Sequence, residues 1–185
     1  MASVVVHACC APCAIYPHRV MSGIYRTTFF FFNPNIEPDD EYNRRLSELK
    51  RYATEDGMTL VVDRGGREQW LEAVRGLEDE PEGGKRCEQC FRFRLARTVQ
   101  FAKANNADLC TTVMSISPHK NSDVINRIGL DLVNGSGVTW LEADFKKGGG
   151  FQKSLTLSKQ ENLYRQNYCG CLASLRRRSG RLDKQ

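Results

Sequence analysis

The sequence alternates short apolar runs with segments of helical periodicity, and this alternation limits the possible folds more than any other feature. The run at residues 3–7 is rich in β-branched side chains and predicts a buried first strand. Pro12 then begins a predicted helix, which Gly23 ends. Strands that alternate with helices form parallel sheets covered by helices on both faces. We therefore expect an α/β fold whose ligand site lies beyond the carboxyl ends of the strands.

The other predicted elements continue this pattern to near the end of the chain. Further strands are predicted at residues 27–32, 59–62, 108–113 and 138–141, and further helices at 39–55, 66–77, 87–104, 122–134 and 158–167. No internal repeat and no strong domain boundary interrupts them. We expect a single α/β catalytic domain over residues 1–175 and a basic carboxyl-terminal tail over residues 176–185.

Basic residues are concentrated in two regions of a chain whose formal net charge is +5. The tail carries five basic residues against one acidic residue, and residues 85–103 carry six against one. Two basic regions on a nearly neutral body attract a polyanion such as RNA, although a solvated tail and helix face have the same composition. Within the helix, Arg92, Arg94 and Arg97 are the candidate contacts to phosphate.

The sequence shows no secretory signal, because Met1 leads directly into the first apolar run without a basic segment. The longest apolar run, residues 29–32, is far too short to cross a bilayer. We therefore expect a cytoplasmic protein with no membrane partner. In a reducing compartment, clustered cysteines indicate metal binding or redox chemistry more often than structural disulfides.

Seven of the eight cysteines fall in three short segments. They are Cys9, Cys10 and Cys13 after the first strand, Cys87 and Cys90 at the start of a helix, and Cys169 and Cys171 near the carboxyl end. The eighth, Cys110, lies within a strand pattern, so we expect it to be a small buried hydrophobic residue.

Two of the three cysteine segments have a spacing that suits metal ligands. Cys87 and Cys90 place both sulfurs on one face of a helical turn, at a helix amino terminus that favours the thiolate. Cys9 and Cys10 lie in the bend between a strand and a helix, where both can face one polynuclear centre. Four thiolates from two segments suit either a structural zinc ion or an iron–sulfur cluster. Spacing alone leaves open whether Cys13 is a further metal ligand.

The third segment, Cys169-Gly-Cys171, differs because its oxidation would close only a very short ring. Such a disulfide is strained and easily reduced, which favours a redox-active dithiol. Two further metal ligands are the alternative. After the fourth predicted strand, His119 and Lys120 lie where a substrate would bind, and we regard both as candidate catalytic residues.

Together these motifs resemble those of the QueH-type epoxyqueuosine reductases. The matching segments occur in order along nearly the whole chain: His7-Ala-Cys-Cys-Ala-Pro-Cys13, Asn33-Pro-Asn-Ile36, Arg86-Cys-Glu-Gln-Cys-Phe-Arg-Phe-Arg-Leu95, Ser115-Ile-Ser-Pro-His-Lys120 and Tyr168-Cys-Gly-Cys171. The resemblance implies an oxidoreductase for the last step of queuosine synthesis, in which an epoxide on the wobble base of tRNA is reduced to an alkene. Its partners would be that tRNA and an unidentified electron donor.

The resemblance also implies roles for individual cysteines. By position, Cys9, Cys10, Cys87 and Cys90 would bind a 4Fe-4S cluster. Cys169 and Cys171 would be the redox-active pair, with a disulfide in the oxidised state. Whether an additional iron is present stays open.

The fold implied by the resemblance is similar to the adenine-nucleotide α-hydrolase-like, ATP-pyrophosphatase-related domains. Those domains carry a Ser-Gly-Gly-x-Asp-Ser phosphate loop after the first strand, where this chain has cysteines, so we expect no ATP chemistry. Two alternatives to the cluster enzyme remain at this point. One is a zinc-stabilised nucleic-acid-binding module without catalysis, and the other is a thiol–disulfide oxidoreductase that acts on proteins.

Overall fold

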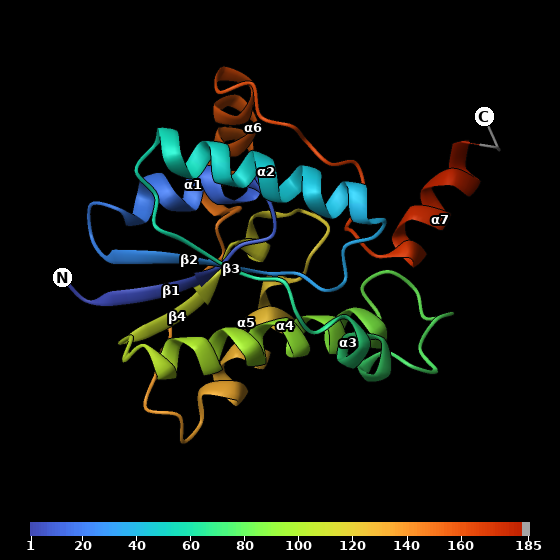
Figure 1. Ribbon diagram of the computed structural model, residues 1–185, viewed down its shortest axis with the longest axis horizontal. Coiled ribbons are helices and arrows are strands. Elements are labelled where there is room, and N and C mark those ends of the chain that lie inside the picture. Colours follow the sequence, from blue (N-terminus) through green and yellow to red (C-terminus); the bar gives the residue numbers. More distant parts are fainter. Residues whose placement is uncertain (183–185) are drawn as a thin grey trace.

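The computed structural model describes residues 1–182, with side chains as far as Arg177. Its centre is one sheet of five parallel strands in the order β3-β2-β1-β4-β5 (Figure 1). The strands are β1 Ser3–His7, β2 Arg26–Phe32, β3 Leu60–Asp63, β4 Leu109–Thr112 and β5 Thr139–Trp140. The predicted α/β class with a parallel sheet is confirmed, and the finer likeness to the adenine-nucleotide α-hydrolase-like domains stays a prediction.

Helices cover both faces of this sheet. The α-helices are α1 Ala11–Met21, α2 Asp39–Glu55, α3 Arg67–Ala73, α4 Lys85–Ala104, α5 Ser122–Val133, α6 Gly150–Gln160 and α7 Leu172–Leu182, with short 3₁₀ helices η1 Val113–Ile116 and η2 Lys147–Gly149. In Figure 1, α1 and α2 lie on one side of the sheet, whereas α4 and α5 lie on the other. Within the described part of the chain, no helix combines the length and apolar character needed to cross a membrane.

Alternate residues of the central strands fill two separate cores, as the pleat of a strand requires. Val4 and Phe29 belong to the core beneath α1 and α2. Val5 and Phe30 belong to the core beneath α4 and α5. Because β1 and β2 are buried on both faces, they read as continuous apolar runs and not as alternating ones.

The order in which the chain adds strands reverses at β1. β2 and β3 lie on one side of β1, whereas β4 and β5 lie on the other. The carboxyl ends of β1 and β4, which are neighbours, therefore open onto the crevice where ligands bind in open α/β sheets. The first cysteine segment follows β1 and the segment with His119 and Lys120 follows η1 after β4, so the topology brings them to this crevice.

The carboxyl-terminal part differs from the sequence prediction. The helix expected at residues 158–167 is wrong: α6 ends at Gln160, and residues 163–166 have no regular structure. The helix forms earlier because it packs against α1, where the Ser154 hydroxyl donates to the Pro12 carbonyl oxygen at 2.6 Å. At Gly150, an added Cβ would lie 1.9 Å from the Phe145 carbonyl oxygen. This tertiary packing outweighs the weak helix propensity of the two serines and the threonine in α6.

Helix α7 was not expected from the sequence. It begins at Leu172 and continues past residue 176, so the first part of the predicted basic tail is helical. Residues 183–185 of that tail lie outside the described residues, as do the side chains from Arg178 onward.

Candidate active site

The first cysteine segment lies in the bend between β1 and α1. Cys10 is the residue before the helix and has an extended backbone, with φ −174° and ψ 161°, and Pro12 occupies the first turn. The sulfurs of Cys9, Cys10 and Cys13 lie within 4.8 Å of one another, with 3.9 Å between Cys9 and Cys10. Among the described residues, these three form a group of thiols close enough to bind one metal centre.

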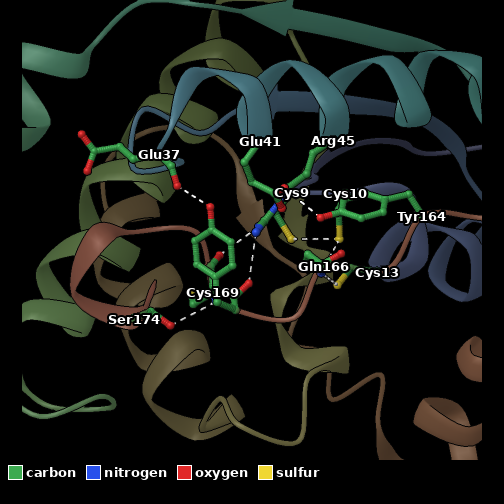
Figure 2. A network of polar contacts seen from close by, with 11 residues as sticks. Cys9, Cys10, Cys13, Glu37, Glu41, Arg45, Tyr164, Gln166, Cys169 and Ser174 are labelled. Atoms are coloured by element: carbon green, nitrogen blue, oxygen red, sulfur yellow. Dashed lines mark hydrogen bonds and ion pairs between the residues drawn. The ribbon is translucent and has the colours of Figure 1, made fainter. Parts of the chain in front are cut away.

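Gln166 covers this group of three thiols from the opposite end of the chain. Its side-chain N–H donates to the Cys10 sulfur at 2.9 Å and lies 3.8 Å from the Cys13 sulfur (Figure 2). Its amide oxygen is buried and has no hydrogen-bond partner in the described structure. The contact therefore ties the segment before α7 directly to the cysteines that follow β1.

The two cysteines of α4 lie in different surroundings. Cys87 faces the cavity described below, and its sulfur accepts a hydrogen bond from the Gly83 backbone N–H at 3.2 Å. Cys90 is buried and packs against Trp70 and Val74, in a small cluster that Cys171 also contacts. All eight cysteines are free thiols in this structure, so the expected Cys169–Cys171 disulfide is not formed here.

The Cys-Gly-Cys segment is held against α2 by Arg45, which is almost fully buried. Its guanidinium donates to the backbone oxygens of Cys169 at 3.0 Å and Tyr168 at 3.1 Å (Figure 2). Glu41, one turn earlier in α2, accepts from Arg45 Nε at 2.7 Å and fixes the orientation of the guanidinium. Arg45 thus positions the backbone on which the Cys169 thiol is carried.

The loop after β2 holds the other side of the same segment. The Glu37 backbone N–H donates to the Gly170 carbonyl oxygen at 2.8 Å, and the Tyr168 hydroxyl donates to the Glu37 carbonyl oxygen. Gly170 has φ +132°, a backbone conformation that side chains rarely adopt, and a Cβ there would lie 3.1 Å from Ile36. Glycine between the two cysteines is therefore required by the local geometry.

These segments surround one cavity of about 490 Å³ at the carboxyl ends of the strands. Its walls include the predicted residues Cys9, Cys13, Cys87, His119, Lys120 and Cys169. Cys10, Cys90 and Cys171 are not among the lining residues: Cys10 contacts Gln166, and Cys90 and Cys171 pack together with Trp70 and Val74 in one small cluster. The cavity thus brings together cysteines from all three segments with the two polar residues that follow η1.

Charges around the cavity favour a thiolate on Cys9. Hydrogen bonds from the Cys10 and Cys13 thiols, helped by Lys120 and Arg94, lower the pKa of Cys9 well below its usual value. Burial raises the pKa of Cys10 well above its usual value. The group therefore holds its first negative charge on Cys9, which is one of its two cysteines that line the cavity.

Lys120 is one of the cations that line the cavity. Burial acts to lower the pKa of Lys120, but thiolate charge on Cys169, Cys9 and Cys13 outweighs burial and raises it. Lys120 therefore stays protonated at neutral pH. His119, in contrast, is exposed at the mouth of the cavity, where its backbone N–H donates to the Ser117 hydroxyl at 3.3 Å.

The three arginines of α4 that were predicted to contact phosphate do not all lie on one exposed face. Arg94 is only 2% exposed and points into the protein. Arg92 and Arg97 are at the surface, where Arg92 is paired with Asp131 and Arg97 with Asp63. Charge along the sequence suggested an exposed face, but Arg94 lies on the buried side of the helix with Cys90 and Leu95.

Arg45 and Gln166 are the site residues that sequence reasoning missed. Arg45 lies on the apolar face of α2, next to Leu46 and three residues after Tyr42. An arginine in that position is a signal of a buried polar partner. Gln166 has no such signal, because it lies in an irregular segment.

The Arg45→Met variant is expected to lose roughly 10–100-fold in turnover, because the carbonyl oxygens of Tyr168 and Cys169 each lose a guanidinium donor and the Cys169 backbone shifts. Arg51→Met on the same helix removes an exposed arginine paired with Glu48 and Glu55, and should stay within about twofold of the wild type. The rate of Cys169 alkylation, followed by peptide mass analysis, checks the positioning directly. An unchanged alkylation rate in Arg45→Met would show that Arg45 does not position Cys169.

Comparison with known proteins gives a consistent result over most of the chain. The sequence model of the family described as epoxyqueuosine reductase QueH matches residues 4–177. The chain is 39% identical over 180 residues to epoxyqueuosine reductase QueH of Streptococcus pyogenes serotype M1, covering 92% of this chain and 69% of that protein. It is 36% identical over 178 residues to epoxyqueuosine reductase QueH of Thermotoga maritima, covering 95% of this chain and 91% of that protein.

Proposed function

Because the chain belongs to the epoxyqueuosine reductase QueH family, we propose that it reduces the epoxide of epoxyqueuosine in tRNA and so forms queuosine. One observation carries this proposal. Cys9, Cys87 and Cys169, which come from three distant segments of the chain, line the same cavity as Lys120. Metal-ligating thiols, a redox dithiol and a fixed cation are the groups that a reductive removal of oxygen requires.

The thiols of the cavity suit an iron–sulfur cluster. Three sulfurs already lie within 4.8 Å of one another, and Cys87 faces the same space. Iron–sulfur clusters are held by cysteine thiolates, and the lowered pKa of Cys9 supports that form of the ligand. We assign Cys9, Cys10, Cys87 and Cys90 as the four ligands, with Cys13 beside them. When bound, the cluster would relay the electrons one at a time and would offer a Lewis-acidic iron.

Cys169 and Cys171 supply the paired redox step. Reduction of an epoxide to an alkene consumes two electrons and two protons and releases the oxygen as water. Oxidation of two thiols to one disulfide provides two electrons and two protons, so the two half-reactions balance. Cys169 faces the cavity, whereas Cys171 packs against the cluster of Trp70, Val74 and Cys90. In our proposal Cys169 meets the substrate, and Cys171 closes the disulfide that the electron donor later reduces.

Lys120 and His119 handle charge and protons on the leaving oxygen. Since Lys120 stays protonated beside Cys9 and Cys169, its ammonium group stabilises negative charge that develops on that oxygen. His119, at the mouth of the cavity, passes to that oxygen one of the two protons that the thiols release. No proton beyond those two is needed.

The cavity also suits a modified base taken out of the anticodon stack. Its volume of about 490 Å³ lies within the range of small-ligand pockets. Arg165 and Arg177 are lining residues of the same cavity, where they can contact phosphates of the anticodon arm. Salt-sensitive binding of tRNA is the expected consequence.

The direct test is anaerobic incubation of the reconstituted protein with epoxyqueuosine-containing tRNA and a reductant. Mass analysis of the released nucleosides should show loss of one oxygen and formation of queuosine. No conversion by protein that retains its iron would contradict the proposal. A colourless protein with one tightly bound zinc that binds tRNA without changing it would instead support the non-catalytic module.

A further inference from the structure

Arg94 places a positive charge in the interior beside the proposed metal ligands. It lies one helical turn after Cys90 in α4, and its side chain is 2% exposed. Its guanidinium donates to the Cys90 sulfur at 3.7 Å and to the Met114 sulfur at 2.7 Å, and its Nε lies 3.5 Å from His7 Nε2. None of these three partners is a carboxylate.

Three neighbouring arginines are balanced by carboxylates. Arg45, which is equally buried, pairs with Glu41. On α4 itself, Arg92 and Arg97 pair with Asp131 and Asp63. Arg86 and Arg94 are buried on α4 and form no ion pair among the described residues, although a buried charge is costly unless an opposite charge compensates it. Arg86 donates to the Glu78 carbonyl oxygen at 2.9 Å, whereas Arg94 contacts the sulfur of Cys90.

His7 is not the compensating group. An imidazole is neutral or positively charged, so it cannot compensate a guanidinium. The His7 ring is fully buried, and it is fixed by Thr112 at 3.0 Å and by the Phe32 carbonyl oxygen at 3.2 Å, on one side of the guanidinium.

The group near Arg94 that can carry negative charge is cysteine sulfur. The guanidinium lies 3.7 Å from the sulfur of Cys90, and both side chains are buried. A cluster held by four thiolates carries net negative charge, and each added electron increases that charge. A fixed cation in low-dielectric surroundings stabilises the reduced state more than the oxidised state.

We propose that Arg94 is the counter-charge of the metal site, and that its buried guanidinium raises the reduction potential of the centre held by Cys9, Cys10, Cys87 and Cys90. This inference rests on the proposed function, because it requires a redox-active cluster at those cysteines. Arg94 is a positioning and electrostatic residue, since it acts on the cluster through the sulfur of Cys90 and touches no substrate.

The test is the midpoint potential of the cluster in Arg94→Met, measured by anaerobic redox titration of the reconstituted protein. Removing the charge should shift the one-electron equilibrium at least tenfold toward the oxidised state, which corresponds to about 59 mV in the negative direction. Arg94→Lys keeps the charge and should recover more than half of this shift. Arg97→Met removes a charge three residues away that is 52% exposed and paired with Asp63, and should leave the potential unchanged.

Iron content and folding of each variant make the outcomes distinct. If Arg94→Met folds but loses iron while Arg94→Lys retains it, the positive charge is needed for the cluster to bind, which supports the counter-charge role. Equal potentials in Arg94→Met, Arg97→Met and the wild type would overturn the inference, as would equal losses in the Met and Lys variants. Arg94→Gln replaces Arg94→Met if the latter does not fold. Wild-type protein that binds no iron or converts no tRNA would contradict the proposed function itself.

Discussion

The Cys90→Ser variant is expected to lose both its iron and its epoxide reductase activity. A serine hydroxyl is a poor ligand for iron compared with a thiolate, so the iron content should fall from about four per chain to below about one. The brown colour of the anaerobically reconstituted protein should disappear with it. Iron analysis and the visible spectrum measure this directly. Because serine has nearly the shape of cysteine, the packing of Trp70 and Val74 against this position is retained.

Two further cysteine variants serve as controls for Cys90→Ser. Cys110 is fully buried in β4 and belongs to the core beneath α4 and α5, so Cys110→Ala should keep its iron. Cys13→Ser should also keep its iron, because our assignment puts Cys13 beside the ligands and not among them. If Cys13→Ser loses iron while Cys90→Ser retains it, the centre is held by the compact group Cys9, Cys10 and Cys13.

The Cys169→Ser variant is expected to lose turnover and keep its cluster. Without the thiol that faces the cavity, the dithiol cannot form its disulfide, and turnover should fall by roughly 10³-fold or more. Iron content should remain near the wild-type value, because Cys169 is not one of the assigned ligands. Nucleoside mass analysis for turnover and iron analysis for the cluster separate the two effects.

The opposite pattern would reassign the Cys-Gly-Cys segment. Loss of iron in Cys169→Ser would make Cys169 a metal ligand, which is the alternative that its sequence spacing left open. Cys110→Ala again controls for the general effect of removing a buried thiol, and it should keep both iron and turnover.

The sheet and most of its helices could be predicted from the sequence because their signals are local. The strand at Ser3–His7 and the helix at Asp39–Glu55 agree with the prediction at both ends. The first is a β-branched run, and the second has acidic residues in its first turn. Helix α6 failed because its stability comes from contacts with α1, such as Ser154 with Pro12, which leave no periodic apolar signal.

The cysteines of the cavity could also be found from the sequence, but the residues that support them could not. Cysteine spacing is visible along the chain, whereas the roles of Arg45 and Arg94 depend on which helix face is buried. Arginine is usually exposed, so charge patterning placed Arg94 on the surface. A stricter reading of its position, four residues after Cys90 and beside Leu95, would have put it on the buried stripe of α4.

The contacts of Arg45 and Gln166 also bear on the order in which the site is assembled during translation. Arg45 and the Cys169 carbonyl that it binds are 124 residues apart, and Gln166 and Cys10 are 156 apart. The ribosome therefore releases Cys9, Cys10, Cys87 and Cys90 long before the segment that covers them. The proposed cluster ligands therefore emerge before residues 165–169, which form part of the cavity wall. Translation arrested before that segment emerges leaves the amino-terminal thiols uncovered and open to oxidation.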